Sequence, residues 1–295
     1  MSWKPVNKLI TLGAGLAVAA TALGAPPAVA AAPPEGAYWH TRSVTTIAHP
    51  WRFGTKSDSY GLLQRRVSET WSAPDGKQWF GYRELGAQPA TEADKKAWQR
   101  DGSPAKWSKS IDGKVVKLSA EPSKGHVSPV RQERDQFHLA GQWLTYDEVQ
   151  RLPADPNRLK DWLTKAGQVY RIEAGSMTGW LSSSLSQLLH ALPAPKEVRA
   201  AAYQALLTLP GVRAGGDAKD TLGRAGAAVV IESSSGTGKK ASTVKRTLIV
   251  DTGRMVLLSE DQAVTVGGKP FGAKSPGTLI EAGWTNSGPA VPALP

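Results

Sequence analysis

The chain of 295 residues contains no cysteine. Disulfide bonds, thiolate metal ligands and a lipid-modified cysteine are therefore excluded, so the folded chain must depend on its own apolar core. The five histidines are scattered, without the H-E-x-x-H spacing of a zinc hydrolase. No second long apolar run follows residue 25, so we expect no membrane span in the body of the chain.

Catalytic sequence motifs occur only as fragments. Residues 103–106 and 242–245 match S-x-x-K, but the Ser-Asp-Asn and Lys-Thr-Gly triplets that accompany this motif in penicillin-binding enzymes are missing. Segment 236–240 lacks the glycine spacing and the hydroxyl residue of a phosphate-binding loop, and we interpret it as a hairpin tip. We therefore expect a protein that is not an enzyme, with no metal, cofactor or nucleic-acid partner.

The N-terminal segment 1–30 has the three parts of a secretory signal peptide. Lys4 and Lys8 form a positive start, residues 9–25 form an apolar run, and residues 28–30 (AVA) offer a cleavage site. We expect a secreted or cell-surface protein whose mature chain begins near residue 31, a start that N-terminal sequencing would reveal. The alternative is an uncleaved membrane anchor, for which the apolar run is slightly short.

The chain is strongly basic. Its formal net charge of +11 falls to +9 once residues 1–30 are removed, because that segment holds two lysines and no acidic residue. An exported protein of this charge would meet anionic wall polymers and lipid headgroups, and its basic surface favours loose adhesion to them. The alternative is a charge that serves solubility alone.

Aromatic and β-branched runs predict strands on both sides of a helical block. The expected strands cover residues 38–47, 59–71, 77–85, 114–118, 137–144, 227–231, 246–250, 255–258 and 279–284. Apolar residues at helical spacing predict helices over residues 156–166, 176–192 and 196–209, with shorter ones at 92–99 and 145–152. This order is typical of an α+β fold in which helices cover one face of a mainly antiparallel sheet.

Local motifs place helix starts, turns and flexible ends. Thr145 and Glu148 have the spacing of a capping box, and Asp155 precedes Pro156 as an N-cap precedes a first-turn proline. Residues 48–57 are expected to form a loop. We divide the chain into a signal peptide (1–30), a disordered leader (31–36), one domain (37–287) and a disordered Pro/Ala tail (288–295).

Eleven tryptophans give the chain a large amount of aromatic surface. Trp71 and Trp79 lie on neighbouring expected strands, while Trp162 and Leu185 lie on the apolar stripes of two expected helices. We expect these four side chains to line an apolar cleft between helices and sheet, a common place for a ligand. The alternative is a cross-strand pair of Trp71 and Trp79 over a core that bulky side chains fill.

Short motifs between residues 38 and 286 carry a resemblance. They are Leu144-Thr145-Tyr146-Asp147-Glu148, Leu152-Pro153-Ala154-Asp155-Pro156, Trp162-Leu163, residues 198–206, Leu209-Pro210-Gly211-Val212, Gly223-Arg224 and residues 248–254. On these motifs the chain resembles a family of exported or membrane-tethered actinobacterial proteins known mainly by a locus tag. The architecture is also similar to the LolA, LppX and RseB group, in which helices cover the concave face of a curved antiparallel half-barrel.

The resemblance implies an exported, non-enzymatic protein that binds or senses a hydrophobic or lipid-like ligand at the cell envelope. The alternative is a protein-interaction or envelope-stress regulatory module with a filled core and no ligand cavity. Its partner would then be an envelope regulatory protein. Neither alternative follows from the fold alone, because one fold carries many functions.

Overall fold

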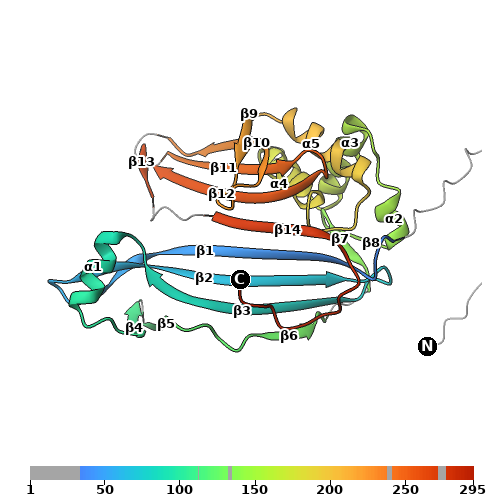
Figure 1. Ribbon diagram of the computed structural model, residues 1–295. Coiled ribbons are helices and arrows are strands. Elements are labelled where there is room, and N and C mark those ends of the chain that lie inside the picture. Colours follow the sequence, from blue (N-terminus) through green and yellow to red (C-terminus); the bar gives the residue numbers. More distant parts are fainter. Residues whose placement is uncertain (1–33, 112, 132–134, 238–240, 272–276) are drawn as a thin grey trace, which may run out of the picture. The chain divides into compact units, whose positions relative to one another are not determined.

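The computed structural model describes residues 34–111, 113–131, 135–237, 241–271 and 277–295 (Figure 1). The strands are β1 (Tyr38–Gly54), β2 (Ser59–Ser72), β3 (Gln78–Pro89), β4 (Lys106–Ile111), β5 (Lys114–Ser119), β6 (His126–Pro129), β7 (Phe137–Leu139), β8 (Gln142–Leu144), β9 (Val212–Lys219), β10 (Ala225–Ser235), β11 (Ser242–Asp251), β12 (Val256–Val266), β13 (Lys269–Pro270) and β14 (Gly277–Thr285). The helices are α1 (Glu92–Arg100), α2 (Tyr146–Gln150), α3 (Pro156–Val169), α4 (Met177–Leu188) and α5 (Lys196–Leu207), with a 3₁₀ turn at Ala174–Ser176.

Ten strands form one open antiparallel sheet. Its order is β6-β3-β2-β1-β14-β12-β11-β10-β9, with β13 paired to β12, and β4–β5 and β7–β8 form separate hairpins. The pairing of β1 with β14 joins the start of the domain to its end, from Tyr38 opposite Thr285 to Thr46 opposite Gly277. The expected α+β class with a mainly antiparallel sheet is therefore confirmed. Among the described helices, none is long and apolar enough to cross a membrane.

The larger hydrophobic core lies between helices α2–α5, the β7–β8 hairpin and one face of β10, β11, β12 and β14. Its fully buried members include Leu159, Leu163, Leu185, Leu188, Leu189, Leu206, Val229, Leu248, Val250 and Leu257. Each such side chain contributes roughly 1.5–3 kcal/mol by leaving water. A second core, around Phe53, Tyr60 and Leu62, forms where α1 and the β4–β5 hairpin cover the other end of β1–β3 (Figure 1).

The helices cover a different part of the sheet from the one expected. The sequence predicts that the helices over residues 156–166 and 176–192 face the first three strands, whereas α3 and α4 pack over β10–β12 and β14. The side chains of the strands explain why α3 and α4 pack over β10–β12 rather than over β1–β3. The face of β10–β12 that meets the helices is aliphatic, while the same face of β1 and β2 presents serine and threonine.

Both predicted helix starts are confirmed. The Thr145 hydroxyl accepts a hydrogen bond from the Glu148 N–H (3.3 Å), and the Glu148 carboxylate accepts one from the Thr145 N–H (2.7 Å). This reciprocal capping box opens α2. The Asp155 carboxylate accepts from the Arg158 N–H (2.9 Å), and Pro156 occupies the first turn of α3.

Residues 48–57 are not the expected loop, because β1 continues to Gly54. The pairing of β1 with β2 shifts register between Ala48 and Arg52 and then resumes, with Phe53 opposite Tyr60. Pro50 falls within this bulge, where a strand tolerates a residue without an N–H donor. The buried Phe53 side chain then explains why the strand resumes.

Further segments also differ from the sequence prediction. Residues 137–144 form the β7–β8 hairpin rather than one strand, with a turn at Ala140 and Gly141, both at positive φ. Strand β9 is not predicted, since an edge strand with glycines and exposed side chains has no apolar alternation. The segment after β14, predicted as a disordered tail, packs on the sheet: the Ala293 carbonyl accepts a hydrogen bond from Arg42 (3.1 Å).

Strands β12 and β14 meet over a short ladder, which in the described residues comprises Ser259 with Leu279 and Glu260 with Thr278. Beyond it, Arg224 donates from Nη1 to the Ile280 carbonyl (3.0 Å) and from Nη2 to the Leu258 carbonyl (2.7 Å). The buried Asp220 carboxylate holds Arg224 Nε at 2.6 Å. One arginine side chain thus supplies the hydrogen bonds that the ladder lacks.

We expect replacement of Leu206 by alanine to lower the free energy of unfolding by about 2–5 kcal/mol, because the side chain is fully buried between α5 and the sheet. Leu222→Ala is the matched control, since Leu222 is 62% exposed in the β9–β10 turn. Urea unfolding measures both. A loss below about 0.5 kcal/mol for Leu206→Ala would contradict the packing described here.

Candidate functional site

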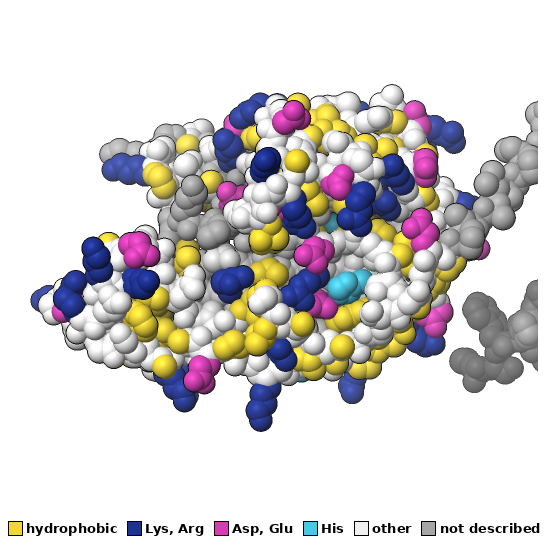
Figure 2. Space-filling model, viewed as in Figure 1, with side chains coloured by type: hydrophobic (Ala, Val, Ile, Leu, Met, Phe, Trp, Pro, Cys, Tyr) yellow, Lys and Arg dark blue, Asp and Glu magenta, His cyan; other side chains and the backbone are white. Residues whose placement is uncertain are grey.

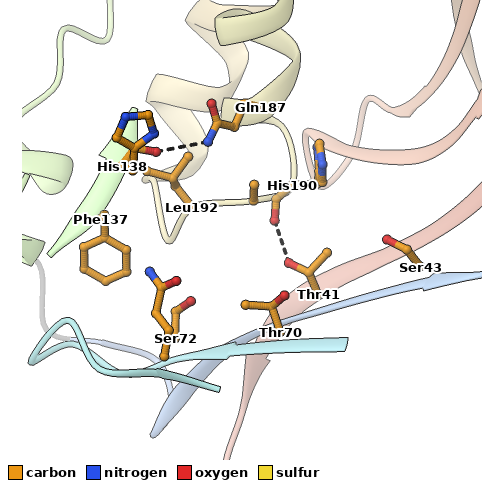
Figure 3. A pocket seen from close by; sticks show the side chains of 11 residues that line it. Thr41, Ser43, Thr70, Ser72, Phe137, His138, Gln187, His190 and Leu192 are labelled. Carbon is orange, nitrogen blue, oxygen red and sulfur yellow. Dashed lines mark hydrogen bonds between the residues drawn. The ribbon is translucent and has the colours of Figure 1, made fainter. Parts of the chain in front are cut away.

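A cavity of about 310 Å³ opens where the α4–α5 connection meets β1 and β2 (Figure 3). Its lining consists of Thr41, Ser43, Thr70, Ser72, Gln78, Phe137, His138, Gln187, His190, Ala191 and Leu192. Of these eleven described residues, none is an aspartate, glutamate, lysine or arginine. The cavity, called the hydroxyl cleft below, therefore offers hydrogen-bonding groups and no carboxylate, ammonium or guanidinium group.

The floor of the hydroxyl cleft comes from the sheet. Thr41 of β1 lies directly opposite Thr70 of β2, and Trp39 lies opposite Ser72. Because side chains alternate between the two faces of a strand, Thr41 and Ser43 point to the same side. The strands thereby hold a patch of hydroxyl groups on a rigid surface.

The wall of the cleft is fixed to this floor by the backbone of His190. Its carbonyl accepts hydrogen bonds from the Trp39 indole N–H (2.8 Å) and the Thr41 hydroxyl (2.9 Å), the second of which is drawn in Figure 3. The Arg199 guanidinium of α5 lies over the Trp39 ring, 5.4 Å from its centroid. These contacts join the helical block to β1 and set the width of the cleft.

The His190 imidazole is held in its neutral form. Burial lowers the pKa of this side chain, and the nearby Arg246 guanidinium acts in the same direction, while the Ser186 carbonyl and the Glu260 carboxylate partly oppose them. Nδ1 lies 3.1 Å from the Ser186 carbonyl, which can only accept, so the neutral ring carries its proton on Nδ1. The other ring nitrogen, Nε2, is then a hydrogen-bond acceptor.

The remaining wall combines an amide with apolar surface. Gln187 of α4 donates from Nε2 to the His138 carbonyl (3.0 Å), which ties the helix to the β7–β8 hairpin (Figure 3). Phe137 and Leu192 add apolar area beside the hydroxyl groups. Such a mixture of a few polar groups and apolar surface is typical of sites that bind small molecules.

A larger cavity of about 780 Å³ lies beside the β1 bulge, with Trp51, Asp94 and Asp261 among its lining residues. The Asp94 carboxylate there accepts hydrogen bonds from Arg52, from the Gly61 N–H and from the Thr91 hydroxyl. These partners lower the pKa of Asp94 against the opposing effect of burial. Since that charge already serves the fold, the hydroxyl cleft is the stronger candidate for a binding site.

The structure does not bring the four predicted cleft residues together. His40 lies between Trp39 and Thr41 and points to the opposite face of β1; the Trp71 ring packs on His40, with centroids 4.8 Å apart. Trp71 and Trp79 are direct cross-strand partners, as the alternative prediction states. Both therefore lie on the face turned away from the helices.

The two helical candidates are also placed elsewhere. Leu185 is fully buried in the core, and Trp162 of α3 is half-buried at the edge of that core. The expected apolar cleft is thus corrected to a core in which aliphatic side chains of helices and strands are in direct contact. Leucine and valine of this volume fill the space that a ligand would need.

The sequence carries one pattern that marks the hydroxyl cleft. Positions 41, 43 and 45 on one expected strand, and 68, 70 and 72 on the next, are all serine or threonine. This period of two predicts a single hydroxyl-rich face. No sequence pattern predicts that His190 lines the cleft, because its position depends on how the α4–α5 connection packs against β1. Among the described residues no group of three His, Asp or Glu side chains is placed to hold a metal ion.

The lowered pKa of His190 makes stability depend on pH. The unfolded chain takes up a proton at this histidine near the ordinary value of 6.5, whereas the folded chain resists it, so acid favours unfolding. We expect the stability that is present above this value to be lost as the pH falls through about 6.5 toward the lower folded pKa. Thermal melts of His190→Gln should lose this dependence, and those of His126→Gln, at an exposed position, should keep it. An identical pH profile for His190→Gln and the natural chain would contradict the assignment.

Comparison of the chain with protein-family models, with curated proteins and with solved structures gave no match. The resemblance to the actinobacterial family and to the LolA, LppX and RseB group therefore stays a prediction. What the protein does must be inferred from the geometry of its own residues.

Proposed function

We propose that this chain is an exported, non-enzymatic binding protein of the cell envelope whose hydroxyl cleft takes a small uncharged ligand rich in hydroxyl or amide groups. The observation that carries the proposal is the lining of the cleft. Four hydroxyl groups on paired strands, two amide side chains and two histidines line it, with no aspartate, glutamate, lysine or arginine among them. A cavity of about 310 Å³ is at the lower end of the range for small-molecule sites.

The chemistry of the cleft favours a polar ligand over an acyl chain. An acyl chain pressed against Ser43 and Thr70 would remove their hydroxyl groups from water without replacing the lost hydrogen bonds. Each such loss costs about 1–3 kcal/mol. The packing between helices and sheet also supports this choice. The apolar side chains there contact one another, so they offer no free apolar surface to an acyl chain.

The architecture and location belong to the same proposal. The open antiparallel sheet with helices over one face supports a LolA-like half-barrel. The N-terminal residues Lys4 and Lys8, the apolar run and the A-x-A site support export, and the net charge supports contact with anionic envelope polymers. Lysine and arginine side chains are spread over the face that Figure 2 shows, as loose adhesion requires.

A protein-interaction module is the second candidate, and the filled core is the observation that favours it. A module of this kind needs no ligand cavity, because its partner binds to the surface of a rigid scaffold. In that case the regulatory partner would contact strand faces or helices rather than the hydroxyl cleft.

Isothermal titration with N-acetylated amino sugars, which carry both hydroxyl and amide groups, tests the first candidate. We expect binding that weakens roughly tenfold in Thr70→Val, because the loss of one hydrogen bond costs about 0.5–1.5 kcal/mol and leaves its partner unpaired. Ser183→Ala, at an exposed position of α4, is the control and should bind as the natural chain does. Binding of a fatty-acid probe that Thr70→Val does not change, with no binding of the sugars, would contradict the proposal.

A further inference from the structure

The segment that follows β14 has a regular proline pattern. Residues 287–295 are SGPAVPALP, with Pro289, Pro292 and Pro295 spaced three residues apart. In a polyproline II helix, which has three residues per turn, this spacing would place all three rings along one edge. The segment turns back after β14, crosses β3 and ends over β2, as Figure 1 shows.

The sheet is shaped to receive the middle proline. Pro292 is buried, and a Cβ on Gly81 of β3 would lie 3.0 Å from its Cδ and 3.1 Å from Trp71 Cζ3. A side chain at position 81 would therefore crowd the proline ring against the Trp71 indole, and the glycine leaves both rings in close contact with the strand. Val291, which precedes Pro292, also packs closely against a glycine: a Cβ on Gly125 would lie 2.9 Å from Val291 Cγ1.

The same face offers aromatic rings in a row. Tyr38 and Trp79 meet edge to face with centroids 5.7 Å apart, and Trp71 lies opposite Trp79 in the β2–β3 ladder. In Figure 2, which views this side, hydrophobic side chains gather over β2 and β3. Surfaces lined by aromatic side chains are the usual receptors for proline-rich segments.

A fixed donor meets the backbone of the segment. Arg42 donates from Nη2 to the Ala293 carbonyl at 3.1 Å. The arginine is held in place by the buried Glu69 carboxylate, which also bonds His40 Nε2 at 2.9 Å. Because a polyproline II helix makes no internal hydrogen bonds, its carbonyl groups remain available to a donor such as this.

The segment itself is held lightly. Val291 is 39% exposed and Leu294 is 54% exposed, so the apolar side chains beside Pro292 contribute little to the folded core. The contact of the Pro292 ring and the hydrogen bond from Arg42 are interactions that a second proline-rich segment can reproduce. Another proline-rich segment could therefore replace residues 287–295 here more easily than it could replace a segment of a packed core.

We propose that this face of β1–β3 is a recognition groove for proline-rich partner segments with the spacing P-x-x-P-x-x-P, and that residues 287–295 occupy it in cis as a competitor. Gly81 and Trp71 form the proline seat, and Arg42 binds a backbone carbonyl of the segment. A tethered competitor acts at an effective concentration in the millimolar range. A partner segment must therefore displace it, which keeps the groove closed to weak ligands.

The full chain carrying Pro292→Asp tests this proposal. The aspartate should release the segment, and a fluorescent peptide SGPAVPALP should then bind at least tenfold more tightly than to the natural chain. Adding Gly81→Val should abolish that binding, while Pro270→Asp, at an exposed proline of β13, should leave the weak binding of the natural chain unchanged. Equal affinity of the Pro292→Asp and natural chains, with both folded by near-ultraviolet circular dichroism, would overturn the proposal.

A second measurement leaves the segment's prolines in place. Because the chain has no cysteine, Leu294→Cys can be labelled with a dye at one site, and position 294 is exposed. Millimolar unlabelled peptide should free the segment and lower the anisotropy of the dye, whereas a peptide of the same composition with scrambled prolines should not. An anisotropy that stays constant with the matched peptide would also overturn the proposal.

Discussion

The large sheet depends on two arginines that donate hydrogen bonds to carbonyl groups of β14, on the side of this strand that faces β12. In the described residues, β12 and β14 share only a short backbone ladder. Arg224 then bonds the Ile280 carbonyl, and Arg254 bonds the Ala282 carbonyl two residues further along β14 (3.3 Å). Carbonyl groups buried without a partner would cost about 1–3 kcal/mol each, so these side chains keep the two parts of the sheet together.

Each arginine is placed by an aspartate in a tight turn. The Asp220 carboxylate accepts from the Arg224 N–H (3.0 Å), and the Asp251 carboxylate accepts from the Arg254 N–H (3.0 Å). Aspartate and glycine at 220–223 and 251–253 are typical of turns, but they do not indicate the destination of either arginine side chain. The destination depends on β14, which is far away in the chain, and so no local pattern reveals it.

The division of the sheet into an aliphatic and a hydroxyl-rich part explains the hydroxyl cleft. Helices pack where valine, isoleucine and leucine of β10–β12 can be buried, and they stop where β1 and β2 present serine and threonine. The α4–α5 connection spans this boundary, and the His190 carbonyl ties it to Trp39 and Thr41. The cleft is thus a consequence of where apolar packing ends.

Local chemistry made much of the fold predictable. The capping box at Thr145, the N-cap at Asp155 and the leucine stripes depend on neighbours within a few residues, so the sequence predicts them well. The faces of Trp71 and Trp79 could not be predicted, because a strand with aromatic and hydroxyl residues on opposite sides does not reveal which side meets the helices. The packing of the segment at Pro292 could not be predicted for a related reason: part of its seat is Gly81, a residue without a side chain.

We propose that the hydroxyl cleft takes a small uncharged ligand, whereas the packed core between helices and sheet leaves no room for an acyl chain. Native mass spectrometry of the protein purified from its own host tests this claim most directly. We expect the mass of the bare chain, or that mass with a small polar adduct that is lost in Thr70→Val. A co-purified lipid that survives gentle desolvation and is unaffected by Thr70→Val would contradict it.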